Sequence, residues 1–196
     1  MAQRAPLTVV NAGYRSTNYW VVSAGTSRLL VDVGWPGTLG TMKASLRRLG
    51  LPLTEIRYAI ATHYHMDHAG LAEELKIEGI PLLVLDVQVA AIPVMKTWMK
   101  PQDHYVEITM QGNVVISFGE SRRLLGEMGI PGEILHTPGH SDDSISLLLD
   151  DGSAFTGDLP PEAYAYDNSV ALDTWRRLRE RGASRIYPAH GPVRAV

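Results

Sequence analysis

Cysteine is absent from this 196-residue sequence, so no disulfide can stabilise the fold and no thiolate can act as a nucleophile or metal ligand. No stretch approaches the roughly 20 consecutive apolar residues that a transmembrane helix needs. Residues 1–6 also lack the long apolar core of a secretory signal. We therefore expect a cytoplasmic protein that makes no contact with a membrane.

A basic stripe is missing as well. The formal net charge is -3, whereas proteins that bind nucleic-acid backbones usually carry clustered lysine and arginine. The densest basic run is typical of the solvated face of a helix; it consists of Arg176, Arg177, Arg179 and Arg181. We expect a small-molecule substrate and no nucleic-acid partner. The sequence leaves open whether the protein forms a homo-oligomer.

What is present is the composition of an ordinary globular protein, with 45% hydrophobic and 20% charged residues. The length suits one domain with a substantial buried core. No linker or low-complexity segment divides the chain. We therefore expect a single domain over residues 1–196.

Short strands and helices alternate in two successive halves. Alternating or continuous apolar runs between turn residues predict the strands, and apolar residues at helical spacing predict the helices. Because every sheet and helix must bury an apolar face, two sheets sandwiched by helices is the natural packing. The strands are predicted at 7–10, 18–23, 28–32, 58–61, 81–85, 114–118, 133–137, 144–149, 154–156 and 185–187, and the helices at 39–49, from Asp67 to about Gly79, at 87–99 with a disturbance at Pro93, at 121–128 and around 171–178.

Four ligand-type side chains fall in one hexapeptide, His63-x-His65-x-Asp67-His68, where a predicted strand passes into a helix. In an extended segment, residues two apart point the same way, so His63 and His65 can bind one ion together. The turn into a helix then lets Asp67 and His68 face a second ion beside the first. Such a hexapeptide at such a boundary is a specific pattern.

Three further ligand-type residues, His140, Asp158 and His190, follow the ends of later strands in turns that contain glycine. Glycine allows tight backbone conformations close to a site, and strand ends on one edge of a sandwich converge in space. Each residue alone would be interpreted as a packed or turn residue. Together with the hexapeptide, they predict a site for zinc, iron or manganese that can hold two ions.

These segments resemble the signatures of the metallo-β-lactamase superfamily. They occur in the family's order, and the resemblance covers nearly the whole chain, from about Asn18 to Gly191. It implies an α/β fold, an αββα sandwich of two mixed β-sheets flanked by helices, with the metals at one edge. The matching segments are Leu30-Val-Asp32-Val-Gly34, His63-Tyr-His65-Met-Asp67-His68, Thr137-Pro-Gly-His140-Ser, Phe155-Thr-Gly-Asp158 and Tyr187-Pro-Ala-His190-Gly.

The resemblance also assigns the ligands. It implies two divalent ions, with zinc as the first choice and iron or manganese as alternatives. Asp158 would bridge the two ions, and Asp32 would orient ligands without binding. His63, His65 and His140 would hold the first ion, and Asp67, His68 and His190 the second.

Metal chemistry then predicts the reaction. Two cations lower the pKa of a shared water towards about 7, so a metal-bridging hydroxide can attack a carbonyl centre at neutral pH. We expect Asp67 to orient the hydroxide and Asp158 to bridge the ions during catalysis. Tyr164 or Tyr166, which follow Asp158 closely, could donate to a developing oxyanion.

The leading hypothesis is a dinuclear hydrolase of a small ester, thioester, lactone or amide, with glyoxalase II-like and lactonase-like enzymes nearest in style. Glyoxalase II has a helical domain after its last motif, whereas only residues 192–196 follow that motif here. We therefore do not expect a glutathione thioester as the substrate. One alternative is a mononuclear iron persulfide dioxygenase of the same fold. A nucleic-acid-processing hydrolase and a binding protein with an unused site are less favoured. His136 is expected to be packed and His104 exposed.

Overall fold

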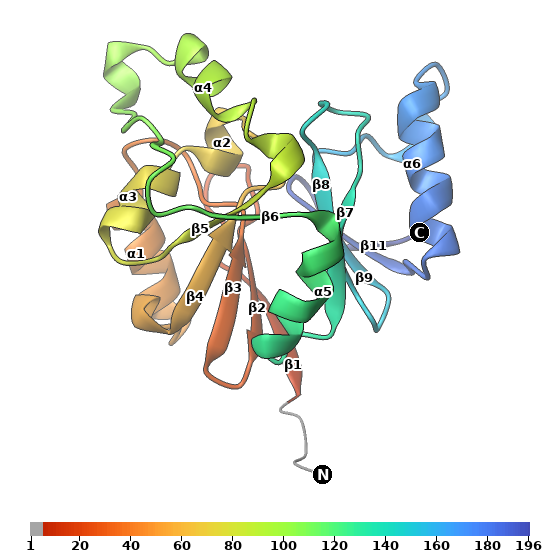
Figure 1. Cartoon of the computed structure of the whole chain (residues 1–196), viewed down its shortest axis with the longest axis horizontal. Coiled ribbons are helices and arrows are strands. Elements are labelled where there is room, and N and C mark those ends of the chain that lie inside the picture. Colours follow the sequence, from red (N-terminus) through yellow and green to blue (C-terminus); the bar gives the residue numbers. More distant parts are fainter. Residues whose placement is uncertain (1–5) are drawn as a thin grey trace.

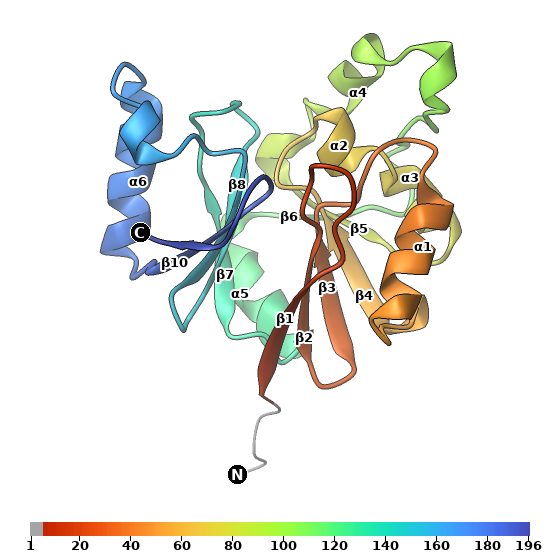
Figure 2. The same cartoon turned by 180° about the vertical axis from the view of Figure 1, so that it is seen from behind.

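The computed structural model describes residues 6–196, and its first half forms a six-stranded mixed sheet (Figures 1 and 2). The first three strands pair antiparallel, and the third to the sixth run parallel. The strands lie side by side in chain order: β1 (Leu7–Asn11), β2 (Trp20–Ala24), β3 (Ser27–Val31), β4 (Ile56–Ile60), β5 (Leu82–Leu85) and β6 (Val114–Ile116).

The second half forms a five-stranded sheet in the order β11-β10-β9-β8-β7. Only β9 and β10 pair parallel, so this sheet is mixed too. The two sheets face each other, which confirms the predicted sandwich. The strands are β7 (Gly132–His136), β8 (Ile145–Leu149), β9 (Ser153–Gly157), β10 (Arg185–Pro188) and β11 (Arg194–Ala195), of which the sequence did not predict β11.

Strand periodicity divides the apolar residues between the two faces of each sheet. On β2, Trp20 and Val22 join the core between the sheets, whereas Val21 joins the core on the outer face. Phe155 of β9 contributes to the inner core from the opposite sheet. Helix α5 (Phe118–Glu127) adds Leu124 and Leu125 to the same core. The inner core therefore fixes the two sheets against each other.

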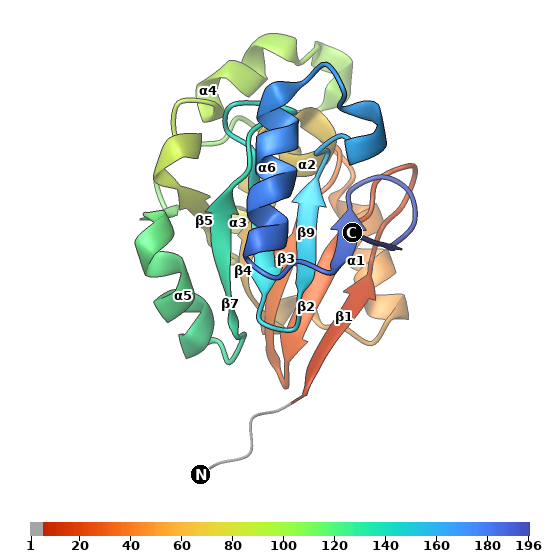
Figure 3. The same ribbon diagram turned by 90° about the vertical axis from the view of Figure 1, so that its right-hand side faces the viewer.

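Helices cover both outer faces. α1 (Leu39–Arg48) and α3 (Ala72–Ile77) pack on the first sheet, where Met42, Leu46 and Leu75 are buried. α6 (Ser169–Glu180) lies along the second sheet, as Figure 3 shows. Its Ala171, Trp175 and Leu178 pack there, within the helix predicted around 171–178.

The prediction of a single helix at 87–99 is wrong. This stretch consists of short pieces: a 3-10 turn at Asp86–Gln88, α4 (Ile92–Met95) and a second 3-10 turn at Lys96–Trp98. Pro93 lies in the first turn of α4, where its missing N–H costs least. The buried Gln88 side chain donates to the carbonyl of Ala61 and accepts from the N–H of Leu85, which anchors the chain to the sheet and stops a continuous helix.

The helix predicted from Asp67 to about Gly79 is also divided, into α2 (Met66–Ala69) and α3. Gly70 lies at the break and packs closely against Pro36. A Cβ at position 70 would lie 2.4 Å from Cδ of Pro36, so only glycine fits this approach. The short α2 directs its two ligand-type residues separately from the longer packing helix behind it.

Within residues 6–196, no helix is long and apolar enough to span a membrane. The cytoplasmic location stays a prediction. The expected lack of a secretory signal concerns residues 1–6, of which 1–5 lie outside the described part.

Candidate metal centre

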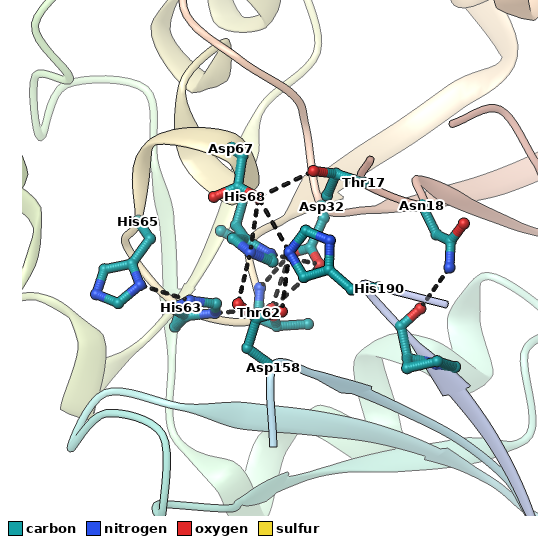
Figure 4. A network of polar contacts seen from close by, with 12 residues as sticks. Thr17, Asn18, Asp32, Thr62, His63, His65, Asp67, His68, Asp158 and His190 are labelled. Atoms are coloured by element: carbon teal, nitrogen blue, oxygen red, sulfur yellow. Dashed lines mark hydrogen bonds and ion pairs between the residues drawn. The ribbon is translucent and has the colours of Figure 1, made fainter. Parts of the chain in front are cut away.

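The seven predicted ligands meet at one edge of the sandwich, where strands of both sheets end. Figure 4 shows these residues except His140. β4 ends at Ile60 and leads to His63, and β9 and β10 lead to Asp158 and His190. Side chains up to 127 residues apart in sequence therefore converge, with each ligand group holding its donor atoms within 4.8 Å of one another.

The first group consists of three imidazoles. Nδ1 of His65 lies 3.0 Å from Nε2 of His63 and 3.1 Å from Nε2 of His140. His63 is fully buried, whereas His140 is partly exposed. Three imidazole nitrogens directed at one point are the donor set of many zinc sites.

The second group contains a carboxylate and two imidazoles. Oδ2 of Asp67 lies 3.4 Å from Nε2 of His68 and 3.2 Å from Nε2 of His190. Asp67 stands in the first turn of α2, as predicted from its place after the strand. The group therefore draws two ligands from the first half of the chain and one from the second.

Asp158 lies between the two groups. Its Oδ2 is 3.4 Å from Nε2 of His68 and 3.8 Å from Nε2 of His140, and its Oδ1 is 3.4 Å from Nε2 of His190. One carboxylate thus faces both imidazole sets, which is the position that a bridging ligand occupies.

The outer nitrogens of three imidazoles have hydrogen-bond partners of their own. Nδ1 of His190 donates to the carbonyl of Ser16 at 2.6 Å, and Nδ1 of His68 pairs with Oδ2 of Asp32 at 3.0 Å. Nδ1 of His63 lies 3.2 Å from the hydroxyl of Thr62. A proton held on Nδ1 leaves the Nε2 lone pair of each ring directed into the site.

Asp32 connects the two groups from behind. Its Oδ1 accepts hydrogen bonds from the backbone N–H of Thr62 at 2.7 Å and from the Thr62 hydroxyl at 2.9 Å. Its Oδ2 pairs with Nδ1 of His68. Asp32 also has a left-handed backbone (φ 63°), an uncommon conformation for a residue with a side chain. The carboxylate thus orients His68 directly and His63 through Thr62.

Burial and neighbouring charges give the imidazoles different proton affinities. Burial, reinforced by the other histidines, lowers the pKa of His63 well below its usual value, and burial also lowers the pKa of His140. Burial opposes protonation of His68 too, but the Asp32 and Asp158 carboxylates outweigh it and raise its pKa to about 10. Burial would raise the pKa of Asp158, but the nearby imidazoles of His68, His190 and His140 outweigh it and lower the pKa, so Asp158 is a carboxylate.

Two buried polar atoms point to what the site is built to hold. Nε2 of His68 and Oδ1 of Asp158 are buried and have no hydrogen-bond partner. Buried polar groups are almost always paired, so these atoms need a ligand. Imidazole and carboxylate donors without any thiolate suit a divalent cation such as zinc, iron or manganese. The residues therefore fit the metal that the sequence predicts.

Comparison with known proteins agrees with this geometry. A family model described as the metallo-beta-lactamase superfamily matches residues 12–190. The chain belongs to the metallo-β-lactamase superfamily. Most proteins of this superfamily are metal-dependent hydrolases that bind divalent metals, and the site described above lies where the superfamily signatures fall in the sequence.

Curated relatives within the superfamily include a "Beta-lactamase-like protein 2 homolog" of Caenorhabditis elegans, 29% identical over 91% of this chain and 57% of that protein. An "Atrochrysone carboxyl ACP thioesterase" of Aspergillus aculeatus is 28% identical over 93% of this chain and 54% of its own. A probable metallo-hydrolase of Methanocaldococcus jannaschii is 29% identical over 92% and 90%. The chain thus spans little more than half the length of the first two relatives.

Solved structures of the superfamily share the fold. A protein of Thermus thermophilus, described as a metallo-beta-lactamase family protein, superposes with a TM-score of 0.71 at 22% identity, covering 97% of this chain and 74% of that one. The crystal structure of "TTHA1623 in a di-iron-bound form" gives 0.70 at 22% identity and covers 96% and 94%. These likenesses confirm the predicted αββα fold.

The two tyrosines proposed as donors are exposed, and neither has a hydrogen bond to a ligand residue among residues 6–196. Tyr164 ends a 3-10 turn at Glu162–Tyr164 and is 76% exposed, and Tyr166 is 82% exposed. A catalytic role for Tyr164 stays a prediction. His136 is half-buried and pairs with the carbonyl of Asp142, and His104 is exposed, as expected for both.

Sequence reasoning missed the turn between β1 and β2. Thr17 donates to Oδ2 of Asp67 at 2.9 Å, as Figure 4 shows. Nδ2 of Asn18 donates to the carbonyls of Pro188 and Gly191, each at 2.9 Å, and so clasps the loop that carries His190. No spacing in the sequence signals these contacts, because they join segments about 50 and 170 residues apart.

Proposed function

We propose that this protein is a dinuclear metal-dependent hydrolase that cleaves a small ester, thioester, lactone or amide. The observation that carries the proposal is the position of Asp158, whose Oδ2 lies within 4 Å of an imidazole from each ligand group. His63, His65 and His140 would hold one divalent cation, and Asp67, His68 and His190 the other. Zinc is the first choice, with iron or manganese as alternatives.

Two divalent cations supply, when bound, a hydroxide equivalent from water at neutral pH and a Lewis acid for a carbonyl oxygen. The chain's own residues do the rest. Asp158 would hold both ions at a fixed separation, and Asp67, anchored by Thr17, would accept a proton at its carboxylate. Asp32 would keep His68 and, through Thr62, His63 in the orientation that ligation requires.

Two related proteins support this choice of reaction. The Aspergillus aculeatus protein carries the name of a thioesterase, and the TTHA1623 structure is described with two irons. Ester and thioester hydrolysis share the attack of water on an acyl carbon. We therefore include acyl hydrolysis and a site for two ions in the proposal, together with a small-molecule substrate and a location in the cytoplasm.

Metal content per chain is the first measurement. Protein purified without chelators or a polyhistidine tag is expected to carry about two equivalents of zinc, manganese or iron by mass spectrometry, and to hydrolyse members of an ester, thioester and lactone panel. A single iron per chain, with oxygen uptake on a persulfide, would favour the dioxygenase alternative instead.

Asp158→Ala tests the bridging role, with Asp150→Ala as its matched control. Asp150 is an exposed carboxylate in the turn between β8 and β9, bound to Arg122 at the surface. We expect Asp158→Ala to abolish turnover and lower the metal content, and Asp150→Ala to change neither. Full turnover by Asp158→Ala with two ions in place would remove the bridge from the proposal.

A further inference from the structure

One cation shares a hollow with the metal ligands. A hollow of about 260 Å³ at the edge of the second sheet is lined by the three ligand residues His140, Asp158 and His190 and by Arg194. Arg194 stands on β11, opposite Ile186 of β10, the strand that leads to His190. The strand pairing therefore fixes the backbone of Arg194 beside the ligand loop.

Arg194 has no carboxylate of its own. Within residues 6–196, no carboxylate oxygen lies within 4.0 Å of its guanidinium. The arginines of α6 differ, since Arg176 contacts Asp173 and Arg179 contacts Glu162. Burial lowers the pKa of Arg194, with no neighbouring acid to offset it. A partly buried guanidinium without an anion is costly, and an anionic ligand would compensate that cost.

The surroundings hold this guanidinium in place. Its central carbon lies 5.9 Å from the ring centroid of Trp175, within the range of a cation–π contact. Trp175 is itself fixed, because it is buried and its Nε1 donates to the carbonyl of Pro160 at 2.8 Å. A guanidinium supported by a rigid ring loses little freedom when it binds a ligand.

Arg194 also borders a second hollow, of about 220 Å³, which it shares with Pro161 and Trp175. Among residues 6–196, Glu162 is the one acidic side chain that lines this second hollow, and it is paired with Arg179 at 2.7 Å. Because Arg194 and Pro161 line both hollows, a group bound to Arg194 would lie beside the hollow that holds Asp158.

We propose that Arg194 is a specificity-determining residue that binds a carboxylate of the substrate, so that the preferred ester, thioester, lactone or amide carries a carboxylate a short distance from the bond that is cleaved. This inference rests on the proposed hydrolase function. A guanidinium suits the task because its planar fork can pair with both oxygens of a carboxylate.

The test compares two esters that differ only in charge: mono-4-nitrophenyl glutarate, which carries a carboxylate, and the 4-nitrophenyl ester of glutaramic acid, which carries a primary amide instead. Arg194→Met should lower kcat/KM for the carboxylate ester by about 10- to 100-fold, mainly through KM, because it removes a charged hydrogen bond. The amide ester should change less than about twofold. Arg194→Lys retains the charge but not the planar guanidinium, so its kcat/KM for the carboxylate ester should lie between those of the native protein and Arg194→Met.

Arg185→Met is the matched control, since Arg185 lies on the strand that pairs with β11 but lines neither hollow. It should leave both esters unchanged. An equal loss on both esters in Arg194→Met would overturn the inference, because Arg194 would then support the site as a whole. No loss on either ester would overturn it as well.

A binding measurement separates this inference from the hydrolase proposal. If the metal-loaded protein cleaves neither ester, the proposed reaction is at fault, and binding of 3-mercaptopropionate and 3-mercaptopropanamide is compared by calorimetry. Both thiols can bind a divalent metal, but only the first carries a carboxylate. Arg194→Met should reduce the preference for the carboxylate about tenfold or more, and an unchanged preference would sink the inference.

Discussion

Oδ2 of Asp32 lies 3.0 Å from Nδ1 of His68, and both side chains are buried behind the ligand groups. Asp32 also accepts two hydrogen bonds from Thr62. A single carboxylate outside both ligand groups therefore sets the orientation of one imidazole in each group, directly at His68 and through Thr62 at His63.

Asp32→Ala should weaken metal binding by about 10- to 100-fold, the usual effect of removing a residue that orients a ligand. It should also lower the free energy of unfolding by about 3–5 kcal/mol, because it breaks a buried pair. Competition with a chromophoric chelator measures the first effect and urea denaturation the second. Thr62→Ser, which keeps the hydroxyl, serves as the control and should retain near-native affinity. Native affinity in Asp32→Ala would refute the orienting role.

Asn18→Ala should weaken the second metal site selectively. Its amide holds the carbonyls of Pro188 and Gly191, on either side of His190, so its loss frees that loop. At limiting metal, dialysed protein should fall from about two ions per chain towards one. Asn113→Ala, in a loop where the Asn113 side chain donates to the sulfur of Met110, should keep both. Two ions of unchanged affinity in Asn18→Ala would show that the clasp is not needed.

Asp67→Asn should reduce kcat by about 10²- to 10⁴-fold, since an amide cannot accept the proton that a general base takes. Thr17→Val should have a smaller effect in the same direction, because it removes only the hydrogen bond to Oδ2 of Asp67. Thr17→Ser keeps the hydroxyl and should behave like the native protein. Steady-state kinetics on the best ester of the panel distinguishes the three, and an unchanged kcat in Asp67→Asn would exclude Asp67 as the base.

The metal-free protein should be most stable near pH 6.5. The pKa values of His63 and His140 are lowered on folding, so the unfolded chain binds more protons in acid and stability falls as the pH drops below about 6.5. The pKa of His68 is raised to about 10, so its contribution is complete below about 6.5 and is lost as the pH rises towards 10.

Urea midpoints measured with a chelator between pH 5 and 9 test this profile. His63→Gln should reduce the fall of the urea midpoint below pH 6.5, and His68→Gln should reduce its fall above pH 6.5. A midpoint that rises continuously with pH in the native protein would contradict the assignment of His68.

Tyr164→Phe should lower kcat about tenfold if the Tyr164 hydroxyl donates to the developing oxyanion, with KM nearly unchanged. Tyr166→Phe tests the alternative donor, because Tyr166 is similarly exposed two residues away. Equal kcat values for the native protein and both variants would remove the tyrosines from the mechanism. The measurement uses the same ester as for Asp67.

The grouping of the seven ligand-type residues could be predicted from the sequence because its signals are local, whereas their assignment to two ions comes from the family resemblance and stays a prediction. Strand-end positions and glycine turns place His140, Asp158 and His190, and the spacing of two places His63 beside His65. The fold followed from the same strand and helix periods. These signals need no knowledge of which distant segments touch.

The rest depends on tertiary contacts that no local pattern encodes. Gln88 looks like any polar residue in a helix, yet its buried side chain binds the backbone of Ala61 and interrupts the predicted helix. Gly70 is required because Pro36 packs against it, and this contact cannot be predicted from the local sequence. Arg194 lies on a strand of two residues. Such a strand is too short to show the alternation of apolar and polar residues from which strands are predicted. Each case couples residues far apart in the chain.

The clasp between Asn18 and the His190 loop also orders events during synthesis. The ribosome delivers His63, His65 and His140 first, whereas the group of Asp67 and His68 cannot be complete until His190 has emerged and Asn18 has captured its loop. The chain order thus allows the imidazole trio to be complete while the second group still lacks His190. Completion of the second group requires the final strands to dock.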